Sequence, residues 1–372
     1  MTRVLILTAS YGSGHNAAAR SLAAGFKRAH TAVTVVDHFA ELVHPVFDRM
    51  SRSLYYSLLR RAPLLWGLGY ALGDWMASDS SLTLGVTHLG TRPLAALLGR
   101  LAPDVVVTVH ATPAAAMSTL ARLGTRVPPH TTVVTDFVAH SQWIARHIDR
   151  YCVAAGEVRH ELIARGIPGE RVVVTGVPLR DEFGEPLAPA EAREALGLSA
   201  QVPVVLAMAG SHGSLGRLPD VARALLALRR PLQGLVVAGH DRQLHATLSR
   251  LTDSTRVRAL GYVADVHRLM AAADLLVTKA GGMTLAEAMA TETPLLLYGS
   301  LPGQERRNER FAARAGVALA ARSRSELAAL LEHALAEPEL LEHLRGRMRR
   351  LRRPDATAHI VSAVLERGVR AP

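Results

Sequence analysis

The sequence TKAGGMTLAEAM occupies residues 278–289 and follows a short apolar run, Asp274–Val277. The apolar run predicts a buried strand, and Leu285–Ala290 is rich in residues that favour helices. The two glycines between them predict a tight turn at which a ligand can approach the backbone closely. Because a helix N-terminus offers unpaired N–H groups and a positive dipole, this strand–turn–helix unit is suited to binding phosphate.

Two side chains beside this turn add candidate contacts. Thr284 is placed either to cap the helix or to give a hydroxyl to a phosphate oxygen. Glu287 lies one helical turn later on the same face, where a carboxylate can accept two hydrogen bonds from a ribose diol. The alternative is an ordinary strand–helix turn in which these two residues form a capping box.

A second polar cluster follows the next apolar run, Pro294–Tyr298. Leu301–Glu305 predicts a turn, and Asn308 lies one helical turn after Gln304. Two amides and the acid Glu305 at the carboxyl end of a strand can hydrogen-bond the hydroxyls of a polyol such as a sugar. Two neighbouring strand–turn–helix units therefore predict a phosphate site beside a sugar site.

Length and composition favour a globular protein of two domains. The chain has 372 residues, of which 49% are hydrophobic and 20% charged, as in α/β proteins. The single cysteine, Cys152, excludes an intramolecular disulfide and a cysteine metal cluster and indicates a reducing cytosol. The residues after Met1 run straight into a glycine loop, and no apolar window reaches roughly 18 residues. We therefore expect neither a signal peptide nor a membrane span.

The net charge is +11, and Lys27 and Lys279 are the only lysines among the 43 basic residues. The simplest explanation for the preference for arginine is genomic base composition. A basic surface nevertheless favours anionic partners: nucleic acid, anionic lipid or a phosphorylated substrate. No zinc finger, aromatic RNA-binding signature or helix-turn-helix pattern is present in the sequence, which disfavours nucleic acid.

The amino-terminal residues predict a second glycine turn of the kind that binds phosphate. Val4–Leu7 and Val33–Asp37 read as buried strands, with a helix over Asn16–Ala29 between them. The turn carries Gly12-x-Gly14 and the second strand ends in an acid, which is close to a dinucleotide-binding fingerprint. An NAD-dependent oxidoreductase is therefore an alternative, although His15 stands where a pyrophosphate would need close backbone approach.

Residues 51–76 hold five of the sixteen aromatic residues of the chain, among leucines and arginines. Segments of this kind can lie in a bilayer interface, or they can form a helical hairpin packed on the domain. The candidate membrane or acceptor contacts are Tyr55, Trp66, Arg60 and Arg61.

Several further predicted strands end in polar residues or glycines. Ligands bind at the carboxyl ends of the strands in open α/β sheets, so we expect these residues to face one cleft. Thr132–Asp136 is one such strand, and Asp136 points towards the same cleft as His15, as does His140. In the second half, the turn containing Gly210 and Ser211 and the turn at Tyr262 end other strands. The predicted boundaries are an amino-terminal domain at 1–178, a linker at 179–200, a carboxyl-terminal domain at 201–353 and a last helix at 354–372.

Taken together, these motifs resemble the family of processive diacylglycerol glucosyltransferases and monogalactosyldiacylglycerol synthases. The resemblance covers nearly the whole chain. It is carried by LILTASYGSGH (5–15), TDF (135–137) with Trp143, TKAGGMT (278–284), PGQE (302–305) and RPD (353–355). It implies the GT-B fold: two Rossmann-like α/β domains facing a central cleft, with the carboxyl-terminal helix crossing back to the first domain. One departure is Ala280, where relatives often carry proline.

The resemblance also implies an inverting, metal-independent transfer of a hexose from a UDP-sugar to a lipid hydroxyl. His15 and Asp136 would serve the acceptor side, His15 as the base with Asp136 orienting it, or Asp136 as the base itself. Gly14 would lie with the acceptor. The remaining carried-over residues would bind UDP (Gly210, Ser211, Tyr262, Gly281, Gly282, Met283, Thr284 and Glu287) and the hexose (Gln304, Glu305 and Asn308).

The expected donor is UDP-glucose or UDP-galactose, and no separate cofactor is expected beside it. The identity of the acceptor and the presence of enzymatic activity stay open. An undecaprenyl-linked peptidoglycan precursor is an alternative acceptor to diacylglycerol, and a silent nucleotide-sugar sensor is an alternative to an enzyme. We expect a cytoplasmic protein attached peripherally to an anionic cell membrane, which the arginine run at 345–353 would also favour.

Overall fold

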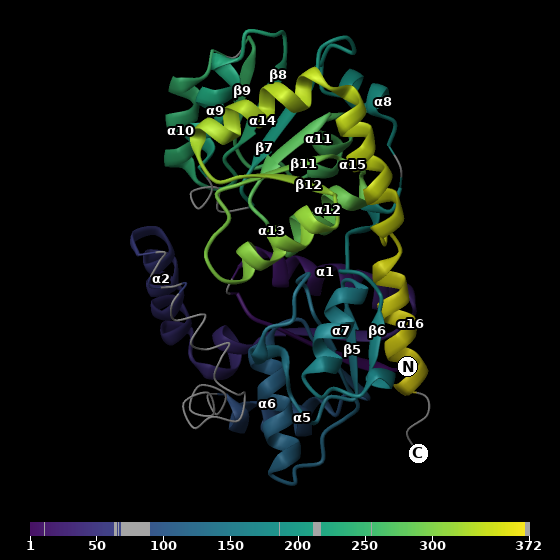
Figure 1. Ribbon diagram of the computed structural model, residues 1–372. Coiled ribbons are helices and arrows are strands. Elements are labelled where there is room, and N and C mark those ends of the chain that lie inside the picture. Colours follow the sequence, from purple (N-terminus) through teal and green to yellow (C-terminus); the bar gives the residue numbers. More distant parts are fainter. Residues whose placement is uncertain are drawn as a thin grey trace. The chain divides into compact units, whose positions relative to one another are not determined.

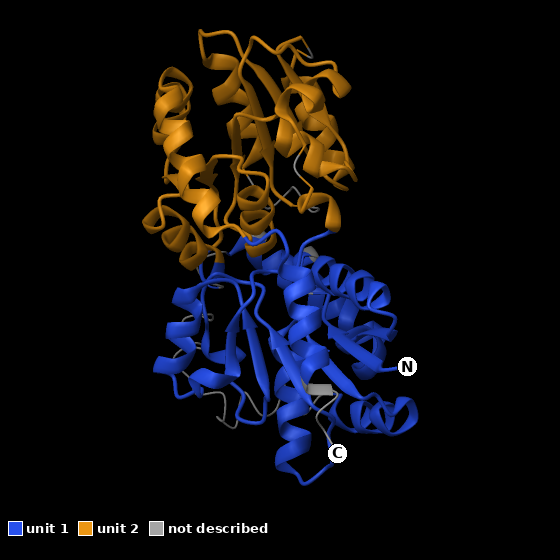
Figure 2. Ribbon diagram, turned by 90° about the vertical axis from the view of Figure 1, so that its right-hand side faces the viewer, with its two compact units in different colours: residues 1–180, 302–304, 353–372 blue, residues 181–301, 305–352 orange. Residues whose placement is uncertain are grey.

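The computed structural model describes residues 1–10, 12–62, 65, 67, 90–185, 187–210, 217–253 and 255–368. The chain forms two compact units (Figures 1 and 2). Unit 1 comprises residues 1–180, 302–304 and 353–372, and unit 2 comprises residues 181–301 and 305–352.

Unit 1 is built on a six-stranded parallel sheet with the order β2-β1-β3-β4-β5-β6. Most of its strands are continuous apolar runs, as expected for parallel strands buried on both faces. The strands are β1 (Arg3–Thr8), β2 (Ala32–Asp37), β3 (Val105–Thr108), β4 (His130–Val133), β5 (Arg150–Val153) and β6 (Val172–Val174).

The helices of unit 1 include the last helix of the chain, which confirms the predicted return of that helix to the first domain. The hydroxyl of Thr357 donates a hydrogen bond of 2.7 Å to the carbonyl of Leu179, and Arg150 donates to the carbonyl of Ala363. A side chain at Gly25 would come within 2.8 Å of Thr357, so glycine allows this close packing. The helices are α1 (Ser13–Arg28), α2 (Pro45–Arg61), α5 (Thr91–Leu101), α6 (Ala111–Arg122), α7 (Gly156–Ala164) and α16 (Ala356–Gly368).

Unit 2 is built on a second six-stranded parallel sheet, with the order β12-β11-β10-β7-β8-β9. Read from β9, the strands stand third, second, first, fourth, fifth and sixth along this half of the chain, which is the Rossmann order. The strands are β7 (Val204–Met208), β8 (Gln233–Val237), β9 (Val257–Leu260), β10 (Leu275–Thr278), β11 (Leu295–Tyr298) and β12 (Ala318–Ala321).

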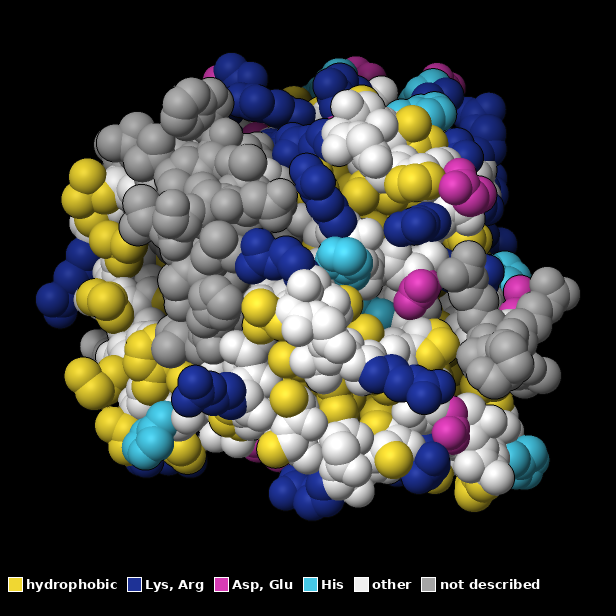
Figure 3. Space-filling model, turned by 90° about the horizontal axis from the view of Figure 1, so that it is seen from below, with side chains coloured by type: hydrophobic (Ala, Val, Ile, Leu, Met, Phe, Trp, Pro, Cys, Tyr) yellow, Lys and Arg dark blue, Asp and Glu magenta, His cyan; other side chains and the backbone are white. Residues whose placement is uncertain are grey.

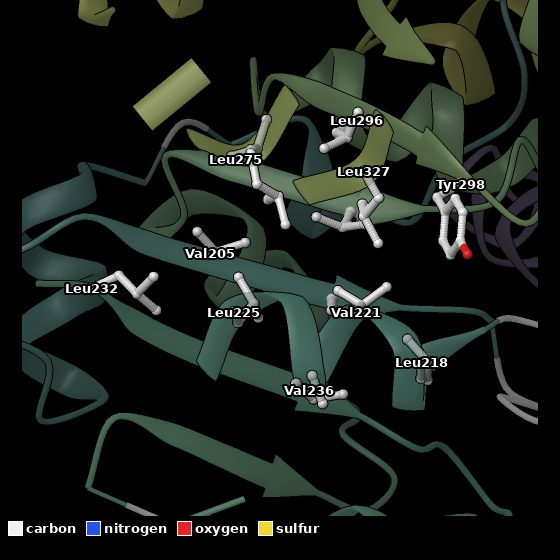
Figure 4. Close-up of a cluster of buried hydrophobic side chains, with 14 of the residues drawn as sticks. Val205, Leu218, Val221, Leu225, Leu232, Val236, Leu275, Leu296, Tyr298 and Leu327 are labelled. Atoms are coloured by element: carbon white, nitrogen blue, oxygen red, sulfur yellow. The ribbon is translucent and has the colours of Figure 1, made fainter. Parts of the chain in front are cut away.

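Helices pack against this sheet through apolar side chains spaced by one helical turn. In α9 (Leu218–Ala227), Leu218, Val221 and Leu225 face the strands and contribute to the core shown in Figure 4. The other helices are α8 (Pro189–Ala195), α10 (Arg242–Leu251), α11 (Val266–Ala272), α12 (Gly282–Ala290), α13 (Gln304–Arg314), α14 (Arg324–Ala336) and α15 (Pro338–Leu351).

Each sheet has one point at which the strand order reverses, and ligands of such sheets bind at the carboxyl ends of the strands there. In unit 1 this point lies between β1 and β3, and in unit 2 between β7 and β10. The residues that follow these strands are therefore the first place to look for a site. They include the turn before His15 in unit 1 and both the Gly210 and the Gly281 turns in unit 2.

Two segments differ from the sequence-based expectations. The predicted linker is not wholly irregular, because it contains a short 3-10 helix, Asp181–Phe183, and the whole of α8. Of the segment predicted as a membrane-interface element or helical hairpin, the structure describes α2 to its end and then residues 62, 65 and 67. Trp66 lies outside the described residues.

Candidate functional site

The turn between β10 and α12 in unit 2 presents an open helix N-terminus. The helix begins at Gly282, with Gly281 at the N-cap position, and no side chain of the described residues caps it. Thr284 is therefore the third residue of the helix. The prediction that it caps the helix is wrong, and so is the capping-box alternative. The first N–H groups of α12 are left to bind an anion, and the Thr284 hydroxyl lies beside them.

Gly281 leaves a space between two polar groups. Its φ of −72° suits any residue, so the backbone conformation does not require glycine. A β-carbon at this position would lie 3.9 Å from Thr284 Oγ1 and 4.0 Å from Lys279 Nζ. The space that glycine keeps open thus lies between a hydroxyl, an ammonium and a helix N-terminus, which is a setting that suits a phosphate group.

The peptide of Ala280 is held in place by the next strand–helix unit. The Ala280 N–H donates a 3.2 Å hydrogen bond to Ser300 Oγ, and the Ala280 carbonyl accepts one of 3.1 Å from Asn308 Nδ2. The Asn308 side chain is fully buried, with 0% exposed. The prediction that Asn308 contacts a sugar directly does not fit this burial. Its position in α13 instead fixes the turn that precedes Gly281.

Glu305 links the two turns through both carboxylate oxygens. Oε1 forms an ion pair with Lys279 Nζ, and Oε2 accepts a 2.9 Å hydrogen bond from the Leu301 N–H. Gln304, at the first position of α13, is partly exposed. Gln304 and Glu305 thus stay the candidates for sugar contact, and Glu305 already has partners in this structure.

The other residues predicted to bind UDP lie on α12 or at strand ends of unit 2. Met283 and Glu287 are partly exposed on α12. Gly210 follows β7 with a φ of 73°, a left-handed conformation that favours glycine, and Ser211 lies outside the described residues. Tyr262 follows β9, is 57% exposed, and stacks on His240 with ring centroids 4.0 Å apart. These contacts with UDP stay predictions.

In unit 1, His15 is oriented by two groups from neighbouring strand ends. Its Nδ1 lies 2.8 Å from the carbonyl oxygen of Val109 and 3.2 Å from Thr135 Oγ1. A carbonyl oxygen can only accept, so the proton of the neutral ring lies on Nδ1. Nε2 then carries the lone pair. His15 is partly exposed, and the arrangement gives it the geometry of a general base.

The pKa of His15 is lowered below its ordinary value of 6.5, chiefly because burial disfavours the charged ring. The negative charge of Asp136 and the hydrogen bond to Val109 act in the opposite direction and raise this pKa. The Asp136 side chain is only 2% exposed. Its influence on His15 is electrostatic, and its burial limits direct contact with a substrate.

His110 is a member of this cluster that the sequence-based predictions missed. Its ring stands edge-on to that of His15, with centroids 4.7 Å apart, and its Nδ1 accepts a 3.1 Å hydrogen bond from Thr112 N–H at the start of α6. Burial lowers the pKa of His110 well below 6.5, and the neighbouring histidines lower it further. The signal available in the sequence was its position at the end of the apolar run 105–110.

The acid that suggested NAD binding has other partners. Asp37 Oδ1 accepts hydrogen bonds of 3.1 Å from both Phe39 N–H and Ala40 N–H, and Oδ2 accepts one from the Ser10 hydroxyl. A dinucleotide site needs this carboxylate for the ribose hydroxyls. The local structure of Asp37 therefore disfavours the NAD-dependent alternative.

Helix α2 carries an exposed apolar stripe. Phe47, Met50 and Leu54 are 41%, 69% and 71% exposed and lie on one face, with Arg61 following on the same face. Tyr55 is half-buried and contacts Tyr56, so it lies off this stripe. Within the described part of the chain, no helix is both long and apolar enough to cross a membrane.

The expected contacts of Gly14, Arg60 and Arg61 with the acceptor or the membrane stay predictions. Gly14 is partly exposed in the first turn of α1, and Arg61 is exposed. The Arg60 side chain lies outside what the structure describes. In the view of Figure 3, Lys and Arg side chains are scattered over the face, with Asp and Glu less frequent among them.

Two family models match the chain. Residues 15–179 match the monogalactosyldiacylglycerol synthase model, and residues 201–350 match the model of glycosyl transferases group 1. A processive diacylglycerol beta-glucosyltransferase of Bacillus mycoides is 32% identical over 367 residues, covering 98% of this chain and 93% of the relative. One of Bacillus cytotoxicus is 33% identical over 368 residues, with the same coverage.

Solved structures share the fold at low sequence identity. MurG of Acinetobacter baumannii superimposes with a TM-score of 0.69 at 18% identity, covering 98% of this chain and all of that one. The calicheamicin glycosyltransferase CalG4 gives a TM-score of 0.62 at 18% identity, covering both chains completely. Both are GT-B proteins, and together with the two parallel sheets they confirm the predicted fold class.

Proposed function

This chain belongs to the family of processive diacylglycerol glucosyltransferases and monogalactosyldiacylglycerol synthases, and on that premise we propose that it is a glycolipid-forming hexosyltransferase. The donor is a UDP-sugar carrying glucose or galactose, and the acceptor is diacylglycerol or a glycosyldiacylglycerol. The observation that carries the proposal is that the chain has both an uncapped helix N-terminus at Gly281 and a His15 ring oriented with its lone pair on Nε2.

Unit 2 supplies the groups for the UDP leaving group. The uncapped N-terminus of α12, the Thr284 hydroxyl and the Lys279 ammonium surround the space at Gly281. Negative charge grows on the diphosphate as the glycosidic bond breaks, and donors already fixed in place stabilise it. We propose that this set stabilises the leaving diphosphate without a divalent metal ion.

Unit 1 supplies the base. Nε2 of His15 takes the proton of the acceptor hydroxyl while the oxygen of that hydroxyl bonds to the anomeric carbon of the hexose. The bond between that carbon and the β-phosphate oxygen breaks, and UDP leaves with the electron pair. Attack from the face opposite the leaving group inverts the anomeric configuration. The charge of Asp136 stabilises the imidazolium that forms.

Product analysis tests the proposed function. Purified protein is incubated with UDP-glucose or UDP-galactose and diacylglycerol vesicles, and the lipids are resolved by chromatography and mass spectrometry. We expect mono- or dihexosyldiacylglycerol from one of the two donors. The absence of a hexosyldiacylglycerol product with both donors would contradict the proposal.

The acid limb of the pH profile tests the role of His15. Only the neutral ring can accept a proton, and burial lowers its pKa. We therefore expect kcat/KM to fall on acidification with a midpoint below 6.5, the ordinary pKa of histidine. Asp136→Asn removes a charge that raises this pKa, so the midpoint should move to lower pH still. A midpoint that rises in this variant would contradict the assignment.

We propose that the protein works at the cytoplasmic face of the cell membrane. The exposed apolar stripe on α2 supports attachment to an anionic leaflet there. Apolar side chains followed by Arg61, on a chain of net charge +11, suit a surface that is apolar inside and negatively charged outside. We propose that Phe47, Met50 and Leu54 enter this interface.

Replacing Met50 and Leu54 together with glutamate should weaken binding to anionic phospholipid vesicles by at least about tenfold, because apolar burial is lost and repulsion is added. Co-sedimentation measures this. The control is Leu123→Glu, which alters a leucine that is 64% exposed at the end of α6. Equal binding by the α2 variant and the control would exclude the stripe as the contact.

A further inference from the structure

We propose that Lys279 couples recognition of the diphosphate to recognition of the hexose by exchanging partners. In the structure its ammonium forms an ion pair with Glu305. When the diphosphate enters beside Gly281, the ammonium turns to it, and Glu305 Oε1 becomes a stronger acceptor for a hydrogen bond from a hexose hydroxyl. This inference rests on the proposed function, because it presumes a UDP-sugar donor.

Each carboxylate oxygen of Glu305 has a partner in unit 2. One of its oxygens is held by Lys279 and the other by the Leu301 N–H. Both side chains of the ion pair are 15% exposed, so little water competes for them. An oxygen that binds an ammonium is a weaker acceptor for a further donor, because the cation draws on its negative charge, so loss of the ammonium makes Oε1 a stronger acceptor for a hexose hydroxyl.

Lys279 is within reach of the proposed phosphate site. Its Nζ lies 4.0 Å from the point that a β-carbon at Gly281 would occupy. A diphosphate there carries more negative charge than one carboxylate and presents several oxygens. Because the attraction grows with charge and is weakly screened in a half-buried site, the ammonium is drawn to the phosphate.

The use of lysine and not arginine at position 279 also favours an exchange of partners. Lysine is used at two positions among 43 basic residues, and arginine at all the others. An ammonium is a compact charge on a flexible stem that can change partners, whereas a guanidinium holds a carboxylate through two parallel hydrogen bonds. Lysine at position 279 fits an exchange, and Lys279→Arg should retain Glu305 and weaken the response to donor.

Isothermal titration calorimetry with UDP and with UDP-glucose tests the exchange, using full-length protein without acceptor. Glu305→Gln keeps an acceptor for the Leu301 N–H but removes the charge that competes for Lys279. We expect this variant to bind UDP about three- to tenfold more tightly than the native protein. The additional affinity that the hexose gives UDP-glucose over UDP should be lost.

Lys279→Met should weaken UDP binding by about tenfold or more, since a charge-assisted contact with phosphate is removed. Lys27→Met is the matched control, because Lys27 is the other lysine and is exposed near the end of α1; its affinities should equal those of the native protein. Circular dichroism and thermal unfolding check that each variant is folded.

The outcomes separate this inference from the proposed function. Unchanged or weaker UDP binding in Glu305→Gln, or unchanged UDP binding in Lys279→Met, overturns the exchange while UDP binding by the native protein upholds the donor site. If the native protein binds neither UDP nor UDP-glucose, the proposed function itself fails, and the exchange fails with it.

Discussion

Replacing His15 with alanine is expected to lower kcat for lipid glycosylation by about 10²- to 10⁴-fold, the usual contribution of a positioned general base. The acceptor hydroxyl would then lose its proton to water, while the groups that surround the UDP site in unit 2 are unchanged. UDP affinity by calorimetry should equal that of the native protein. The loss should therefore fall on kcat and spare donor binding.

The control for His15 is His160→Ala, which removes an exposed imidazole from α7 of the same unit. It should leave kcat unchanged. If His15→Ala retains a near-native rate of transfer, His15 is not the base, and the buried Asp136 becomes the remaining candidate. Steady-state rates with saturating donor and mixed-micelle acceptor give the comparison.

Replacing Gly281 with alanine is expected to weaken UDP binding by about 100-fold. The added methyl group would occupy the space between Thr284 Oγ1 and Lys279 Nζ, at 3.9 Å and 4.0 Å, and keep phosphate oxygens out of it. One or two charge-assisted hydrogen bonds of about 1.5–3 kcal/mol each account for a loss of this size. Calorimetric titration with UDP measures it.

The fold should tolerate this substitution, which makes the result interpretable. The φ of −72° suits alanine, and the contacts that the methyl group would make are at ordinary van der Waals distance. Gly346→Ala in α15 is the control, because a β-carbon there meets no atom within 4 Å. Equal UDP affinity in both variants would mean that the diphosphate binds elsewhere.

The strands could be predicted because their cause is local. Parallel strands covered on both faces are continuous apolar runs, and on that basis the runs Val4–Leu7 and Asp274–Val277 predict β1 and β10. The residue at which α12 begins was harder to predict from the sequence. Thr284 has the chemistry of a cap, but the helix begins two residues earlier, at Gly282.

The site was predictable only as far as strand ends indicate it. His15 and Asp136 could be placed together because their strands end near the point at which the strand order reverses. His110 could not be recognised as a neighbour of His15 without the pairing of β1 with β3. The roles of Asn308 and of the α2 stripe depend on burial, which follows from packing that no local pattern encodes.

The central claim is a single in-line displacement in which fixed groups of the protein, without a metal ion, stabilise the departing UDP. Its most direct test is the anomeric configuration of the glycolipid formed from an α-linked UDP-hexose in excess chelator, read from the proton NMR coupling constant. The account predicts a β-linked hexosyldiacylglycerol formed at an undiminished rate. An α-linked product, or a reaction that the chelator abolishes and a divalent ion restores, would contradict it.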